Sequence, residues 1–178
     1  MFVSLKINQL QDAIYAYQRV LDQKERHVDH EVLSYLVDNV VDEVQANPGE
    51  ASKFLEKQLA ELFGRLTSQI STDPELWGVY QSFHKRMGRL EKAIDLRWKQ
   101  LRSAQSSGWE QNEAQFVRVV RVCEELVEEL ISAQDKSGAY SLKLNLSSAL
   151  KKCRAVFEQH ADFTALAALL ARIEQFAG

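Results

Sequence analysis

The sequence predicts an all-α protein, and three features support this prediction. Apolar residues recur three and four positions apart along nearly all of the 178 residues. No segment of useful length alternates apolar and polar residues with the period of two typical of a half-buried strand. The chain has only 7 Gly and 2 Pro, fewer turn-forming residues than sheet proteins usually need. We therefore expect helices joined by short turns, an arrangement that favours antiparallel hairpins.

Turn signals divide the chain into eight expected helices. Pro48 ends one helix and opens the next, because the residue before a proline avoids the α region and proline suits a first turn. Asp73-Pro74 is a second start signal, and Gly88 is a natural residue just past a helix end. Lys136-Ser137-Gly138 is expected to form a later turn. The expected helices span 8–25, 28–46, 48–70, 74–86, 89–104, 109–134, 139–159 and 162–177.

Composition limits the classes of function. With 46% hydrophobic and 26% charged residues, the chain suits one domain, 1–178, with its own core. No apolar run approaches the roughly 18 residues of a membrane span, so no membrane partner is expected. The net charge of −3 disfavours nucleic-acid binding. Two distant cysteines are too few for a disulfide framework, which indicates a reducing compartment.

Residues 77–101 match the tetratricopeptide helical-hairpin pattern. Trp77 and Tyr80 occupy early positions of the first helix, and Gly88 falls at the turn. A small residue at position 93 lets the two helices of the hairpin approach closely. The second-helix packing positions hold Leu90, Ala93 and Leu101, whereas the pattern is broken by Gln81, His84 and Arg97.

Residues 9–22 resemble the second helix of the same repeat, with Ala13 and Tyr17 at packing positions. Too few residues precede this helix to form its partner, so 1–25 is expected to be a half repeat, and the chain a C-terminal fragment of a longer repeat protein. Hairpins are expected over 28–71, 74–104 and 109–160, followed by a capping helix, 162–177. Stacked hairpins of this kind predict a right-handed superhelical solenoid.

Three further segments carry a family resemblance: 59–80, 106–120 and 142–152. In this order they resemble the C-terminal region of the tetratricopeptide repeat protein 27 family. The resemblance implies a large helical-repeat scaffold of cytoplasm and nucleus, without catalytic residues. It also implies a link to chaperone-assisted assembly of large complexes, including the U5 spliceosomal particle.

Candidate sites of other kinds have simpler interpretations. His27, Asp29 and His30 have spacing that suits two metal ligands, but with no third ligand nearby a polar turn with a helix cap is favoured. Cys123 and Cys153 lie on apolar faces, where free cysteine acts as a small hydrophobe rather than a redox pair. No metal and no cofactor is therefore expected.

One dense basic run offers a candidate partner-binding site. Its donors could grip an acidic peptide or a phosphate, although basic residues also suit an ordinary solvated helix end. Glutamate pairs at 124–125 and 128–129 weaken an RNA-binding interpretation. Trp109 could anchor a partner, but burial against a neighbouring hairpin is favoured. The candidate partner-binding residues are His84, Lys85, Arg86 and Arg89, with Lys92 and Arg97 following.

The sequence thus predicts a non-catalytic scaffold that binds protein segments on its concave face. It has no Ser/His/Asp order, no Gly-rich phosphate loop and no nucleophile elbow, so no enzyme activity is expected. The expected partners are other proteins and the remaining repeats of the parent chain. One alternative is a structural end-cap of a longer solenoid, with the binding surface elsewhere. Nucleic-acid binding is a third, disfavoured alternative.

Overall fold

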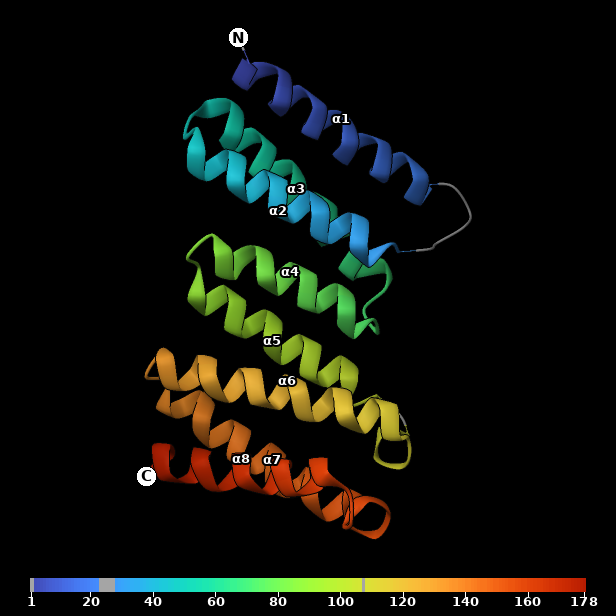
Figure 1. The fold of residues 1–178 in the computed structure, drawn as a ribbon, viewed down its shortest axis with the longest axis vertical. Helices are drawn as coiled ribbons and strands as arrows, with labels where there is room; N and C mark the ends of the chain where they lie inside the picture. The colour runs from blue at the N-terminus through green and yellow to red at the C-terminus, as the bar shows by residue number, and fades with distance from the viewer. Residues whose placement is uncertain (1, 23–27, 107) are drawn as a thin grey trace. The chain divides into compact units, whose positions relative to one another are not determined.

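The structure, a computed structural model, describes residues 2–22, 28–106 and 108–178, and it confirms the all-α prediction (Figure 1). Within these ranges every regular element is a helix: eight are α-helices and one is a short 3-10 helix. The helices fall into two compact units. Unit 1 holds residues up to Ser71 and Glu75–Arg89, and unit 2 holds Thr72–Pro74 and Leu90–Gly178.

Unit 1 contains four helices: α1 (Phe2–Asp22), α2 (His30–Ala46), α3 (Glu50–Gln69) and nearly all of α4 (Pro74–Arg86). Helix α1 packs on both α2 and α3, which contact each other (Figure 1). Aromatic rings from α3 and α4 meet in the core, where Phe63 stacks on Tyr80 with ring centroids 4.7 Å apart. These aromatic contacts hold α4 against α3.

Polar groups fix the ends of these helices. Asp29 caps α2 by accepting a 3.0 Å hydrogen bond from the Val32 amide, and its own amide donates to the Tyr17 hydroxyl at 3.0 Å. At the other end of the unit, Gly88 takes a left-handed φ of 72°. Its amide and that of Arg89 donate back into the last turn of α4, which closes that helix as the sequence predicts.

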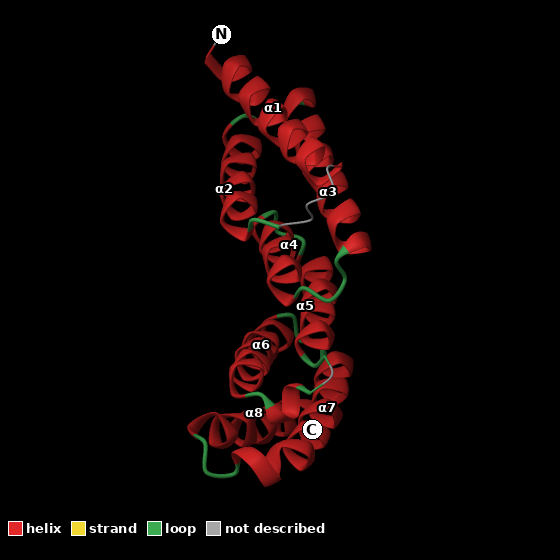
Figure 2. Ribbon diagram, turned by 90° about the vertical axis from the view of Figure 1, so that its right-hand side faces the viewer, coloured by secondary structure: helices red, strands yellow, loops and turns green. Residues whose placement is uncertain are grey.

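Unit 2 contains α5 (Leu90–Ala104), the 3-10 helix η1 (Trp109–Gln111), α6 (Glu113–Ser132), α7 (Lys136–Phe157) and α8 (Ala161–Ala177). Helix α6 is central, because it contacts α5, α7 and α8, and α7 packs along α8 (Figure 2). One continuous apolar core runs through all five elements, from Ile94 to Ile173. Within it, Phe116 and Phe157 stack with ring centroids 4.4 Å apart.

Three expected boundaries are wrong. The helix expected at 8–25 already begins at Phe2, so residues 2–7 belong to it. The helix expected from Trp109 is a 3-10 turn, and α6 starts only after the Asn112 cap. The expected turn at 136–138 is the first turn of α7, capped by Asp135, which accepts a 2.8 Å hydrogen bond from the Gly138 amide.

A glycine makes that last cap possible. A Cβ at position 138 would lie 2.4 Å from an Asp135 carboxylate oxygen and 2.5 Å from a Leu130 methyl carbon. The turn between α6 and α7 lies before the first residue of α7, at Gln134, which takes a left-handed φ of 57°. Gly138 is therefore needed for a close approach rather than for a turn.

The expected repeat-packing residues divide between the units. Trp77 and Tyr80 are buried in unit 1, whereas Ala93 and Leu101 are buried in unit 2. Leu90 is half-buried and packs against the core of unit 2, and Gly88 is exposed at its turn. Since the two helices of the expected 74–104 hairpin belong to different units, their pairing stays a prediction, as do the single domain and its handedness.

In α1 one of the two expected packing residues, Ala13, is wrong. Ala13 is exposed, because the buried side of α1 is formed by Ile7, Leu10, Ile14 and Leu21. Tyr17 falls at the edge of this stripe and is half-buried. None of the helices in the described ranges is long and apolar enough to span a membrane.

Candidate protein-binding face

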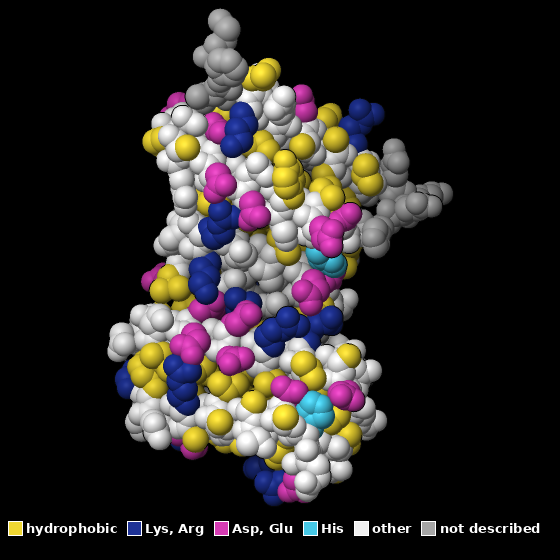
Figure 3. Space-filling model, viewed as in Figure 1, with side chains coloured by type: hydrophobic (Ala, Val, Ile, Leu, Met, Phe, Trp, Pro, Cys, Tyr) yellow, Lys and Arg dark blue, Asp and Glu magenta, His cyan; other side chains and the backbone are white. Residues whose placement is uncertain are grey.

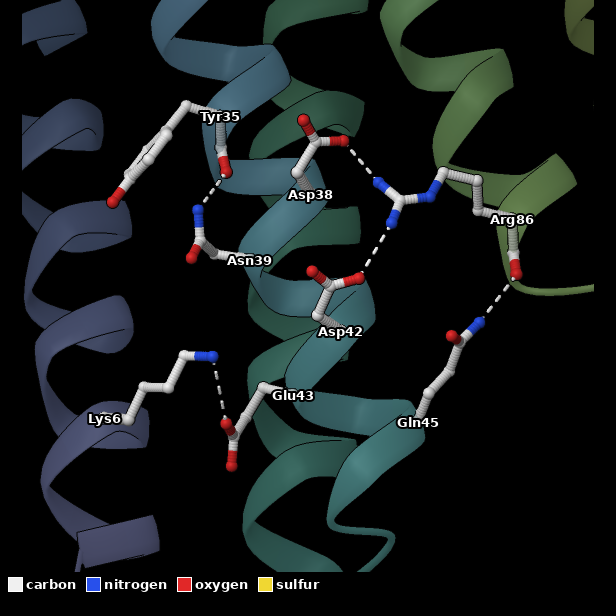
Figure 4. A network of polar contacts seen from close by, with 8 residues as sticks. All are labelled: Lys6, Tyr35, Asp38, Asn39, Asp42, Glu43, Gln45 and Arg86. Carbon is white, nitrogen blue, oxygen red and sulfur yellow. Dashed lines mark hydrogen bonds and ion pairs between the residues drawn. The ribbon is translucent and has the colours of Figure 1, made fainter.

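One side of α2 is exposed and carries mixed polar and aromatic side chains (Figure 4). The opposite side of the helix is buried through Leu33, Leu36, Val37, Val40 and Val41, and this spacing leaves a continuous outer stripe. We call this stripe the α2 face. Tyr35 is its most prominent aromatic group, with 65% of its surface exposed. The α2 face consists of Val32, Tyr35, Asp38, Asn39, Asp42 and Gln45.

Arg86, at the end of α4, is bound to the α2 face by three contacts (Figure 4). Its guanidinium pairs with the carboxylates of Asp38 and Asp42, the latter at 2.9 Å. The Gln45 amide donates a 3.0 Å hydrogen bond to the Arg86 carbonyl. Because the two aspartates lie one helical turn apart, a single planar guanidinium reaches both of them. These contacts hold the end of α4 against α2.

On its other side the α2 face borders α1, where Lys6 points toward the buried carboxylate of Glu43 (Figure 4). The Glu43 side chain is 3% exposed, and the Lys6 ammonium lies 3.6 Å from it. The Asn47 amide donates a 2.9 Å hydrogen bond to the same carboxylate. One helical turn before Glu43, the side-chain amide of Asn39 donates a 2.9 Å hydrogen bond to the backbone carbonyl of Tyr35. The backbone that carries the Tyr35 side chain is therefore held by a side-chain hydrogen bond in addition to those of the helix.

The structure corrects the expected basic site. His84 is only 1% exposed and packs its ring against those of Tyr80 and Phe83, each at 5.0 Å, so it cannot contact a partner. Arg86 is paired as described, and Arg89 pairs with Glu56. Lys85 is exposed, and it too has a partner within the chain. The four residues therefore do not form a basic cluster.

The visible surface agrees with this correction. Figure 3 shows acidic and basic side chains interspersed on this side of unit 1, rather than a separate basic patch. Such mixed charges suit a protein partner better than a polyanion, which requires a continuous positive surface.

In unit 2 the chain buries an ion pair that the sequence only hinted at. Arg97 stands where the repeat pattern expects an aromatic or apolar residue, and it reaches across from α5 to α6. Its guanidinium donates to the Glu129 carboxylate at 3.0 and 3.3 Å, and it also contacts Glu125 at 2.5 Å. The side chains of Arg97 and Glu129 are 8% and 3% exposed. In the sequence, the spacing of four between Glu125 and Glu129 could have indicated an acidic partner for Arg97 on this helix.

The remaining candidates belong to the core. Trp109 is 4% exposed and stacks near Phe116, with centroids 6.5 Å apart. Cys123 and Cys153 are both buried free thiols. Burial raises the pKa of Cys123 to about 12 and that of Cys153 to about 11, so both stay protonated at neutral pH.

The expected histidine motif is only partly described. His27 lies outside the described residues, and Asp29 serves as the cap of α2. Among the residues that are described, no group of three or more His, Cys, Asp or Glu side chains is placed to hold a metal ion.

The amino-acid sequence of the chain is similar to that of a known protein. Over 177 residues, which are 99% of this chain, it is 33% identical to a tetratricopeptide repeat protein 27 homolog from Dictyostelium discoideum. Over nearly its whole length the chain is therefore similar to part of a tetratricopeptide repeat protein 27 homolog. This confirms the resemblance that the sequence predicted, and the chain spans about a fifth of that relative's length (21%). No protein-family model and no solved structure matches the chain.

Proposed function

We propose that this chain is a non-catalytic protein-interaction scaffold and that the α2 face binds a segment of a partner protein. The observation that carries the proposal is the exposed Tyr35, held among amide and carboxylate groups on a helix that is fixed on both sides. Tyrosine is a favoured anchor in protein interfaces, because it offers a large apolar area and a polar tip.

The chemistry of the face indicates the kind of segment it takes. Asp38 and Asp42 are both paired by one arginine, so their two negative charges are only half neutralised. A partner segment with an apolar side chain over Tyr35 and a donor or cation toward Asp42 would complement the α2 face. The similarity to a tetratricopeptide repeat protein supports a protein partner, since such repeats present helix surfaces for binding.

The resemblance extends the proposal to a cellular role. We infer that the protein assists the assembly of large complexes in cytoplasm and nucleus, linked to chaperones and to the U5 spliceosomal particle. A structural end-cap without a partner of its own is the competing hypothesis, and the experiment below separates the two.

The test replaces Tyr35 by Ser in the intact protein and measures recovery of its bound proteins. Phe54→Ser is the matched control, because Phe54 is also an aromatic of unit 1 that is half exposed, on α3. Loss of an interface anchor costs about 2 kcal/mol or more, so at least one bound protein should be recovered about tenfold less with Tyr35→Ser. Unchanged recovery, or equal loss with Phe54→Ser, would refute the proposal.

A further inference from the structure

Helix α7 is the most one-sidedly charged element of unit 2. Its 22 residues include five cations and no aspartate or glutamate: Lys136, Lys143, Lys151, Lys152 and Arg154. The first two already have partners, since Lys136 contacts the Phe176 carbonyl and Lys143 lies 3.8 Å from Glu174. The other three are exposed and form no ion pair within the described residues. Unused positive charge therefore gathers in the second half of α7.

Apolar side chains stand next to this charge on the same side of the helix. Tyr140 and Leu144 are 57% and 55% exposed. Positions 140, 144, 148 and 151 are spaced by three or four residues, so they share one side of α7. We call this stripe the α7 face, formed by Tyr140, Leu144, Ser148, Lys151 and Lys152.

A small polar cavity adjoins the α7 face where α7 meets the end of α5 and η1. Its volume is about 120 Å³, enough for several water molecules or one carboxylate group. Gln105 and Asn145 form one wall and bind each other through both amides, at 3.0 and 3.1 Å. The lining residues are Gln105, Trp109, Asn145, Ser148, Ala149 and Lys152.

The cavity lining supplies donors and lacks carboxylates. Lys152 brings a cation and Ser148 a hydroxyl. Trp109 also lines the cavity, and its indole N–H is a further hydrogen-bond donor. The neighbouring Glu110 is close enough to raise the pKa of Cys153, but it does not line the cavity.

We propose that the α7 face is a second docking site, which binds an acidic segment of a partner protein. One carboxylate of the segment enters the donor-lined cavity beside Lys152, and a large apolar side chain covers Leu144 and Tyr140. Leu144 and Lys152 are eight positions apart, about 12 Å along a helix, which about four residues of extended chain would span. The proposal therefore specifies a leucine or aromatic residue about four positions from a glutamate or aspartate.

The site is separate from the α2 face, because every residue that forms it belongs to unit 2. It also differs in charge, since the α2 face carries aspartates and the α7 face carries lysines. Failure at one face therefore leaves the proposal for the other intact.

The experiment is a fluorescence-polarisation titration of the purified chain with a labelled peptide of about eight residues. The peptide carries one leucine and, about four positions away, two glutamates, with Gly and Ser elsewhere; both orders are tested. A companion peptide has glutamine for glutamate. We expect saturable binding of the acidic peptide, weakened by salt, and about tenfold weaker binding of the companion.

Matched variants locate the site. Lys151→Glu with Lys152→Glu should weaken binding about tenfold or more, whereas Lys53→Glu with Lys57→Glu, an equal charge change on α3, should leave it within about twofold. Leu144→Ser should weaken it, and Val156→Ser, an equally exposed site of α7, should not. Trp109→Phe keeps an aromatic ring and removes the indole N–H, so a loss of about threefold or more is expected with unchanged helicity by circular dichroism.

Several outcomes would overturn the proposal. They are no saturation at about 1 mM peptide, equal binding of the glutamine companion, or equal loss in the α3 charge variants. A single-stranded RNA oligonucleotide and inorganic phosphate serve as alternative probes. If RNA binds in a manner sensitive to Lys151 and Lys152 while the peptide does not bind, the site is a polyanion site and the proposal is wrong.

Discussion

Removing Arg97 should destabilise unit 2 far more than removing the whole ion pair. In Arg97→Met, the Glu129 carboxylate, which is 3% exposed in the natural protein, loses its two hydrogen bonds to the guanidinium, at 3.0 and 3.3 Å. Breaking a buried pair by deleting one partner costs about 3–5 kcal/mol, because the remaining charge stays desolvated. We therefore expect Arg97→Met to lower the free energy of unfolding by about 4 kcal/mol.

The reverse change should be milder. In Glu129→Met the guanidinium keeps its contacts to Glu125, which is 44% exposed, and to Gln100 at 2.6 Å. A residual partner near solvent reduces the loss to about 2–3 kcal/mol. The double variant has two apolar side chains of similar volume, and such replacements are often neutral, so it should lie within about 1 kcal/mol of the natural protein.

The assay is urea unfolding of all four proteins, followed by circular dichroism and arranged as a double-mutant cycle. The expected coupling between Arg97 and Glu129 is several kcal/mol, because the double variant costs less than either single change. Additive losses, or a loss below about 1 kcal/mol for Arg97→Met, would show that the pair is solvated and the reasoning wrong.

Four other outcomes are expected. Trp77→Ala should cost about 3–5 kcal/mol in urea unfolding, and a loss within about 0.5 kcal/mol would contradict its burial. Gly138→Ala should cost about 1–2 kcal/mol by displacing the Asp135 cap, whereas the exposed Gly64→Ala should not destabilise. Burial raises the pKa of Cys123 from 9.0 to about 12 and that of Cys153 from 9.0 to about 11, so at high pH the folded state keeps protons that the unfolded chain releases. The free energy of unfolding should therefore be highest below about pH 9 and should fall as the pH rises toward 11. Urea unfolding curves at several pH values check this. Amide hydrogen exchange should be faster in α1 than in α6, which contacts three helices, and equal protection in a dilute monomer would refute this.

Much of the fold could be predicted because apolar spacing reveals helices. The bounds of α4 were found from Pro74 and Gly88, whose backbone constraints act locally. The start of α7 was missed because glycine usually signals a turn. There Gly138 serves a close approach, and Gln134 takes the left-handed conformation that glycine usually supplies.

The candidate site was harder to predict from sequence. His84 follows Tyr80 by four residues, so the helical period already placed it on the buried side of α4. The partners of Arg86 could not be found in the same way. They lie 44 and 48 positions away, and only tertiary packing brings them together. The pairs Asp38/Asp42 and Glu125/Glu129, each with a spacing of four, were the available but ambiguous signals.

The buried carboxylate of Glu43 has a consequence for how α1 is chosen as a neighbour of α2. A cation at the position of Lys6 lets α1 cover this carboxylate without leaving the negative charge to the Asn47 amide alone. A shift of α1 along α2 by one helical turn would keep the same side of α1 buried and still separate the two charged groups. The ion pair therefore favours one register of α1 along α2. It also disfavours replacement of α1 by another amphipathic helix of equal hydrophobicity that lacks this cation.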